Sequence, residues 1–98
     1  MKNLFCIIVS YTKPMEEIEA VLPLHRKYLT KGYEAGFLLA SGPQNPRVGG
    51  LILGYFENKQ SAEAFTKNDP YAQHNLAKYE IIEFSPVLHA EILKDFLA

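Results

Sequence analysis

Two segments of this chain carry apolar residues on both of their alternating faces, and they lie at residues 4–9 and 51–56. Both segments have the length and the Ile, Leu and Phe content of β-strands. A strand of an antiparallel sheet with one face in water normally alternates apolar and polar residues. These strands do not alternate in this way, so we expect both faces of their sheet to be covered.

The remaining segments place these strands in a defined order. The patterns indicate strand, helix, strand, strand, helix, strand. The strands are expected at 4–11, 37–40, 48–56 and 78–84, and the helices at 15–35 and 59–68. This order repeats the split β-α-β unit, and it predicts an α+β, ferredoxin-like βαββαβ protomer with an antiparallel sheet.

Two residues bear on the limits of the first helix. Pro23 lies within it, where the missing N–H and the ring of proline interrupt helical hydrogen bonding. We therefore expect this helix either to start late or to be kinked at Pro23. Gly36 follows the last apolar position and should close the helix, because glycine adopts the left-handed conformation found at many helix ends.

Residues 1–98 should form a single domain, because domains commonly contain ~100–150 residues. Residues 86–98 extend beyond the last strand and could form a short amphipathic helix. The residues of this extension that are expected to point inward are Leu88, Ile92, Leu93 and Phe96.

A two-layer fold would put both helices on one face of the sheet and leave the second apolar face in water. A contiguous exposed apolar surface usually marks an interface. We therefore expect a homodimer that packs sheet against sheet, and the C-terminal segment could extend that assembly to a higher oligomer. The alternative is that the C-terminal segment alone covers this face.

Charge, hydropathy and cysteine content argue against several classes of protein. The net charge is −1 and lysines are interspersed with acids, so we expect no nucleic-acid partner. No segment approaches the ~18–20 apolar residues of a membrane span, so we expect no membrane association. Cys6 is the only cysteine, which rules out an internal disulfide and favours a reducing, cytoplasmic location. Inside an apolar run, Cys6 is better explained as a buried inert thiol than as a nucleophile.

His25 and Asp69 are the two ionisable residues expected to point inward. His25 follows Leu22 by three residues and lies on the apolar stripe of the first helix, and Asp69 follows Phe65 by four on the stripe of the second. If the two side chains meet, the carboxylate would fix the tautomer of the imidazole and leave the other ring nitrogen free for proton transfer. The alternative is that they only satisfy each other, or that Asp69 is a turn residue.

Four further residues could bind a substrate. Ser41 and Gly42 follow a strand end, where a glycine allows close approach of a ligand and a serine could bind it or simply cap the turn. Arg47, in the next loop, could receive an anionic group or be solvated. Tyr71 could roof a pocket beside Asp69 or pack against the helix end.

Metal and cofactor sites lack their usual patterns. His74 and His89 show no metal-ligand spacing with each other or with Cys6, so we expect no metal. The pair Gly49-Gly50 lacks the glycine patterns that cradle phosphates. No cofactor is required by anything in the sequence.

Several short motifs together resemble one known family. The motifs are LHRKYL (24–29), GFLLASGP (36–43), GG (49–50), NDPY (68–71) and YEIIEFSP (79–86). Their order and spacing resemble the YciI-like, or YCII-related, proteins, and the resemblance runs from the first strand to about Pro86.

This resemblance implies a dimeric α+β barrel built from ferredoxin-like protomers. It also implies an active site with a His–Asp pair, which maps to His25 and Asp69, near an SGP element that maps to Ser41 and Gly42. One related branch eliminates chloride from a chlorinated hydroxyhydroquinone, and the wider superfamily includes muconolactone isomerase and small monooxygenases. Substrate identity does not follow from such a resemblance, because one fold supports many functions.

We therefore expect a small enzyme in which His25 is the general acid/base and Asp69 orients it. The expected reaction is an elimination, isomerisation or dehydrochlorination of a small cyclic or aromatic acid or phenol. One alternative is a non-catalytic module that binds or senses a small molecule in the same cleft. A second is a haem- or redox-linked barrel with a histidine as axial ligand, which visible absorbance would reveal.

Overall fold

In the computed structural model, which describes residues 1–98, four strands form one antiparallel sheet. The strand order across the sheet is β2-β3-β1-β4, so the two central strands are the first and third along the chain. The strands are β1 (Leu4–Tyr11), β2 (Leu38–Pro43), β3 (Gly49–Gly54) and β4 (Ala77–Phe84). This is the ferredoxin-like arrangement that the order of elements predicts.

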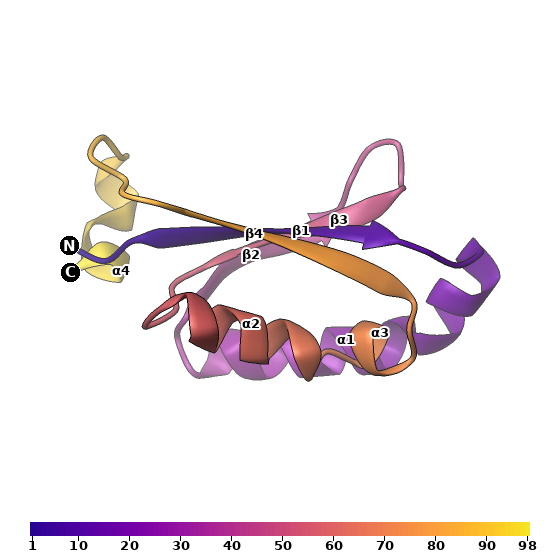
Figure 1. The fold of residues 1–98 in the computed structure, drawn as a ribbon. Helices are drawn as coiled ribbons and strands as arrows, with labels where there is room; N and C mark the ends of the chain where they lie inside the picture. The colour runs from indigo at the N-terminus through magenta and orange to yellow at the C-terminus, as the bar shows by residue number, and fades with distance from the viewer.

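The main helices lie together on one face of the sheet, as Figure 1 shows. They are α1 (Met15–Glu34), α2 (Lys59–Lys67) and the short α3 (Pro70–Gln73). The hydrophobic core fills the space between these helices and the sheet. Its most deeply buried members are Phe5, Ile7 and Val9 of β1, Ile52 of β3, Ile18 of α1 and Ala62 of α2.

Of the two alternatives expected for Pro23, a late start of α1 was wrong. The helix begins at Met15 and includes Pro23, so it does not start late. Pro23 cannot bond the carbonyl of Glu19, but Glu19 is exposed and water can serve that carbonyl. Gly36 has a φ of 88° just after the C-cap residue Ala35, as expected for the glycine that closes a helix.

The limits of β2 and β3 differ from the expectation. β2 does not end at Ala40 but continues through Ser41 and Gly42 to Pro43, because β3 offers backbone partners along this length. Pro43 is tolerated at the end of an edge strand, where its missing N–H breaks no central ladder. β3 is shorter than expected and ends at Gly54. The helix α3 was not expected from the sequence.

The C-terminal extension contains a 3-10 turn, η1 (Glu91–Leu93), and a short helix, α4 (Lys94–Leu97). Leu97 is the buried residue of α4, and the N–H of Lys2 donates to the Leu97 carbonyl at 2.8 Å. The expectation that Leu88 and Ile92 point inward was wrong, since they are 92% and 88% exposed. The extension lies at the end of the sheet beside the N-terminus (Figure 1), because its backbone is anchored there.

The face of the sheet opposite the helices is open and is apolar around Cys6, whereas Ser10, Lys78 and Glu80 make it polar toward one end. Alternation along β1 puts Cys6 and Ile8 on this face, and the strand register places Ile82 and Leu53 on either side of Cys6. Cys6 is half-buried, rather than buried as expected. We call this surface the open face and define it by Cys6, Ile8, Leu51, Leu53, Ile82 and Phe84. None of the helices has the length and apolar character needed to span a membrane.

Candidate active site

His25 and Asp69 meet although 44 positions separate them in the chain. His25 projects from α1, and its Nδ1 lies 2.8 Å from Oδ1 of Asp69, just before α3. The Asp69 side chain is fully buried, whereas 12% of the His25 side chain is exposed. The pair therefore has one buried member and one member that reaches the protein surface.

Asp69 is held in place by the start of α3. Asp69 is the N-cap residue of this helix, Pro70 follows at the first helical position, and the N–H of Tyr71 donates to Oδ1 at 3.1 Å. Proline at this position loses no helical hydrogen bond, and aspartate is a favoured N-cap. Asp69 was expected to end the second helix, but α2 ends at Lys67, with Asn68 as its C-cap, and Asp69 begins the next helix instead.

The second carboxylate oxygen of Asp69 has its own donor. The hydroxyl of Tyr79, on β4, donates to Oδ2 at 2.8 Å. Burial raises the pKa of Tyr79 well above its ordinary value, and the Asp69 carboxylate raises it further, so this hydroxyl stays protonated and remains a donor. Sequence reasoning missed Tyr79. The available signal was its place two residues before Ile81, on the inward face of β4.

The surroundings of Asp69 decide the tautomer of His25. An ionised carboxylate is only an acceptor, so the Nδ1–H of His25 must donate to it. In the neutral imidazole, Nε2 is then an unprotonated acceptor. The His25 ring stacks on the ring of Tyr71, with centroids 4.0 Å apart and planes 10° apart. This stacking and the hydrogen bond at Nδ1 together restrict rotation of the imidazole.

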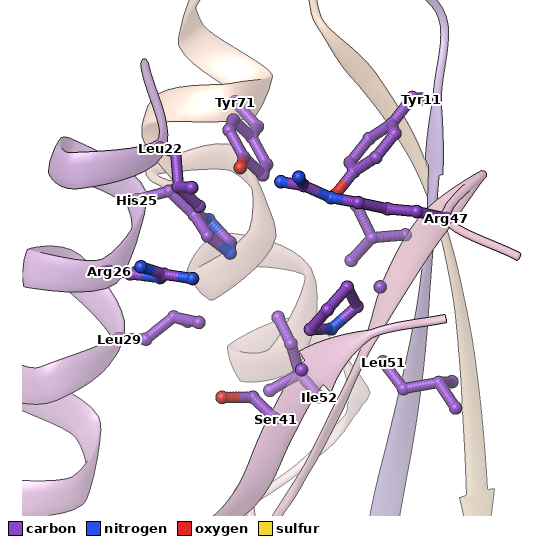
Figure 2. A pocket seen from close by; sticks show the side chains of 14 residues that line it. Tyr11, Leu22, His25, Arg26, Leu29, Ser41, Arg47, Leu51, Ile52 and Tyr71 are labelled. Atoms are coloured by element: carbon purple, nitrogen blue, oxygen red, sulfur yellow. The ribbon is translucent and has the colours of Figure 1, made fainter. Parts of the chain in front are cut away.

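A cavity of about 180 Å³ opens beside the His25 ring. Figure 2 shows His25, Arg26 and Leu29 projecting toward it from α1, with Ser41 and Ile52 on the sheet side. The apolar part of the wall includes Val9, Leu22, Leu29 and Ile52. An apolar cavity of roughly 150 Å³ can hold benzene, so the size suits one substituted ring.

All the residues predicted from the sequence for this site line the cavity, except Asp69, which lies behind His25. Ser41 contacts it from β2, and its hydroxyl is 2.7 Å from that of Tyr33 on α1. Gly42 also lines it, and a Cβ at this position would meet no protein atom within 4 Å, so packing inside the protein does not require a glycine there and the close approach of a ligand stays a prediction. Tyr33 was not found from the sequence.

Arg47 and Tyr71 form another end of the cavity. Arg47 comes from the loop between β2 and β3, and Figure 2 shows its guanidinium directed toward Tyr71 and Tyr11. It lies 6.0 Å from the centre of the Tyr11 ring and 3.7 Å from a carboxylate oxygen of Glu19. Sequence reasoning named Arg47 and Tyr71 but not Tyr11, whose side chain the apolar run of β1 does not distinguish.

The other histidines take no part in this site. His74 and His89 are exposed, and neither lines the cavity. No three His, Cys, Asp or Glu side chains lie close enough together to hold a metal ion. The side chains at this cavity supply an acid–base group, His25, and several hydrogen-bonding groups.

Residues 4–85 match the family described as YCII-related domain. Among solved structures, the chain is similar to 5-chloro-2-hydroxyhydroquinone dehydrochlorinase from Burkholderia phenoliruptrix AC1100, in complex with 2,5-dihydroxybenzoquinone. The TM-score is 0.73 at 16% sequence identity, and the similarity covers 84% of this chain and 93% of the dehydrochlorinase chain. At this identity the likeness establishes the fold alone. None of the curated proteins matches the chain at a significant level.

Proposed function

The chain belongs to the YCII-related domain family, and we propose that it is a small-molecule enzyme in which His25 is the general acid/base and Asp69 orients it. The observation that carries this proposal is the 2.8 Å contact between Nδ1 of His25 and Oδ1 of Asp69. This contact leaves Nε2 without a protein partner beside a cavity of the right size for one ring. A base with a fixed tautomer and a free nitrogen is the arrangement that proton abstraction requires.

The proposed reaction begins with the neutral imidazole. Nε2 of His25 takes a proton from a carbon of the ring substrate, and the C–H electron pair forms a new double bond. In an elimination, the leaving group on the adjacent carbon departs with the electron pair of its own bond. In an isomerisation, a pre-existing double bond breaks as the new one forms, and its electron pair takes the proton back from the imidazolium at another carbon. The Asp69 carboxylate stabilises the imidazolium in both cases, as in other His–Asp pairs.

Cavity size supports a substrate with a single ring. The volume of about 180 Å³ matches one substituted six-membered ring. A haem contains four pyrrole rings and would need several times this space, so the size disfavours a haem-linked barrel. The structurally similar dehydrochlorinase is named for a single-ring substrate and was solved with a single-ring ligand, which agrees with this proposal.

Turnover of single-ring compounds by the purified protein tests the proposal. We expect His25→Gln to lower kcat/KM by roughly 10²–10⁴, the usual contribution of a general acid/base. Asp69→Asn should also lower kcat, and ¹⁵N NMR of the imidazole should report protonation at Nδ1 in the unmodified chain. If the protein binds ring compounds but converts none, the non-catalytic binding module is the better description.

A homodimer is part of the same proposal. Three large apolar residues on the open face, Leu51, Ile82 and Phe84, are between 41% and 44% exposed. The C-terminal extension does not cover them, since it lies at the end of the sheet (Figure 1). A contiguous apolar surface on a sheet favours an interface. A second copy that presents the same face is the simplest partner, because a two-fold interface is self-complementary.

A further inference from the structure

Two hydrogen-bond donors at one end of the cavity have no partner. The side chain of Tyr71 is 2% exposed, and its hydroxyl is buried without a hydrogen-bond partner. The Nε of Arg47 is likewise buried and unpaired, although the rest of that side chain is partly exposed. Buried polar groups are nearly always hydrogen-bonded, so two such donors lining one cavity indicate a missing acceptor.

The charges around these donors select the kind of acceptor. Arg47 is permanently cationic. The pKa of Tyr71 is raised to about 12, chiefly by burial, and the nearby Arg47 cation partly opposes the rise, so the Tyr71 hydroxyl remains a donor at neutral pH. Glu19 is the carboxylate in contact with the guanidinium, at 3.7 Å from Nη1, and it leaves Nε unpaired. The Tyr11 hydroxyl lies near both donors and raises the pKa of Arg47 and of Tyr71 by hydrogen bonding, but neither Nε of Arg47 nor the Tyr71 hydroxyl has a partner within hydrogen-bond geometry. A cation and a neutral donor that both lack a well-placed acceptor suit an anionic oxygen.

We propose that this end of the cavity is an oxyanion subsite, in which the Nε–H of Arg47 and the hydroxyl of Tyr71 bind a carboxylate or phenolate oxygen of a single-ring ligand. The inference rests on the proposed function only for the role of His25 as the reacting group. Binding of the anion does not depend on that function. It assigns the substrate to the class of small aromatic or cyclic oxyanions.

The subsite also sets the orientation of the ring. Tyr71 stacks directly on the His25 imidazole, so a group bound to the Tyr71 hydroxyl is anchored beside the catalytic nitrogen. The ring itself would contact the apolar wall formed by Val9, Leu29 and Ile52. Arg47 and Tyr71 are therefore specificity-determining residues, because the position of the oxyanion decides which ring carbon faces Nε2 of His25.

Binding of benzoate, measured by titration calorimetry or NMR shift changes, tests the inference without any turnover. Benzamide has nearly the same shape but no charge. We expect Arg47→Gln and Tyr71→Phe each to weaken benzoate binding by about tenfold or more, the usual effect of losing a hydrogen bond to a charged group. Benzamide should bind more weakly than benzoate to the unmodified chain and should lose little further in Arg47→Gln. Ionised 4-nitrophenolate, measured in the same way, distinguishes a phenolate from a carboxylate preference.

A matched control removes the same charge outside the cavity. Lys27 is exposed on α1 and does not line the cavity, so Lys27→Gln should change benzoate affinity by less than about twofold. Arg26 lines the α1 side of the cavity, so the effect of Arg26→Gln on benzoate affinity shows whether the anion binds on that side instead. A larger loss of affinity in Arg26→Gln than in Arg47→Gln would place the anion elsewhere and overturn the subsite.

Two further outcomes would also overturn it: no binding of either anion by the unmodified chain, or equal binding of benzoate and benzamide. The proposed catalysis is tested separately by turnover and by the ¹⁵N spectrum of His25. If turnover depends on His25 while anion binding ignores Arg47, only the subsite fails. If Arg47 controls benzoate binding while no ring compound is converted, only catalysis fails.

Discussion

The carboxylate of Asp69 accepts hydrogen bonds from three different elements. Oδ1 binds the ring of His25 from α1 and the N–H of Tyr71 from α3, and Oδ2 binds the hydroxyl of Tyr79 from β4. The cost of burying a charged carboxylate is met only when such partners are present. Any change to one donor should therefore affect both the stability of the fold and the position of His25.

Replacement of Tyr79, the hydroxyl donor on β4, tests how much one hydrogen bond to the buried carboxylate contributes to stability. Tyr79→Phe leaves a buried carboxylate oxygen unpaired, and we expect a loss of ~1.5–3 kcal/mol in the free energy of unfolding, measured by urea denaturation. Tyr28→Phe is the matched control, because its hydroxyl donates to the neutral backbone carbonyl of Phe65 at 2.7 Å and should cost only ~0.5–1.5 kcal/mol. Equal losses in the two variants would contradict the role of the buried charge.

One buried and one partly buried tyrosine, Tyr71 and Tyr28, should make the fold sensitive to alkali. The pKa of Tyr28 and that of Tyr71 are each raised to about 12, mainly by burial. An unfolded tyrosine titrates near ~10, so above that pH the unfolded chain releases protons that the folded chain retains. This contribution to stability is fully present below pH ~10 and is lost as the pH rises toward ~12.

Urea denaturation at a series of alkaline pH values measures this effect. The free energy of unfolding should fall across this window, and it should fall less steeply in Tyr28→Phe and in Tyr71→Phe than in the unmodified chain. Lysines titrate in the same range, but their contribution is common to all three proteins. If the three slopes are the same, the hydroxyls are not the cause.

At the scale of elements, the packing of β3 against β1 depends on a glycine. A Cβ on Gly49 would lie 1.7 Å from the carbonyl oxygen of Val9, a backbone atom that cannot move without displacing β1. Residues 49–50 therefore have a structural explanation that is separate from phosphate binding. The loop that carries Arg47 joins β2 to β3, and the N–H of Tyr11 on β1 donates to the Val48 carbonyl of this loop at 3.0 Å.

Alanine substitution at two glycines separates this packing effect from backbone entropy. Gly49→Ala should destabilise the fold by ~1–3 kcal/mol or more, because the strands must separate to admit the methyl group. Gly42→Ala meets no atom within 4 Å and should change stability by less than ~0.5 kcal/mol. Thermal or urea unfolding of both variants provides the measurement, and a harmless Gly49→Ala would contradict the close approach.

For the whole molecule, the open face is the surface that calls for a partner. The helices cover one side of the sheet only (Figure 1). The strand register places apolar residues from three strands on the other side. The register places Cys6 between Ile82 and Leu53, so the apolar surface is continuous across the strands. Such a surface is costly in water, which is the reason to propose a second copy against it.

Light scattering after gel filtration tests this assembly. We expect the unmodified chain to elute as a dimer and Ile82→Asp to elute as a monomer, because the new carboxylate would be buried without a partner in the interface. Ala20→Asp makes a comparable change at an exposed position of α1, on the helix side, and should leave the dimer intact. A monomeric unmodified chain would remove the basis for a sheet-to-sheet interface.

Local patterns in the sequence determined much of this structure. The periodicity of apolar residues predicted β1 at residues 4–11, the helix that begins at Met15, and the inward direction of His25 and Asp69. These features depend on residues a few positions apart, whose preferences are set by strand and helix geometry. The extent of β2 was missed because it depends on pairing with β3. The helix α3 was missed because Asp69 and Pro70, which follow the helix expected at 59–68, start a helix too short for apolar periodicity to mark.

Only the tertiary structure decided which side chains meet. The contact of Asp69 with Tyr79, the stacking of Tyr71 on His25 and the approach of Arg47 to the same cavity join segments from different elements. Such contacts depend on how the helices pack on the sheet. Spacing along the chain does not determine the distance between side chains of different elements. The sequence by itself therefore determined which groups turn inward, whereas packing determined their partners and left two donors of the cavity unpaired.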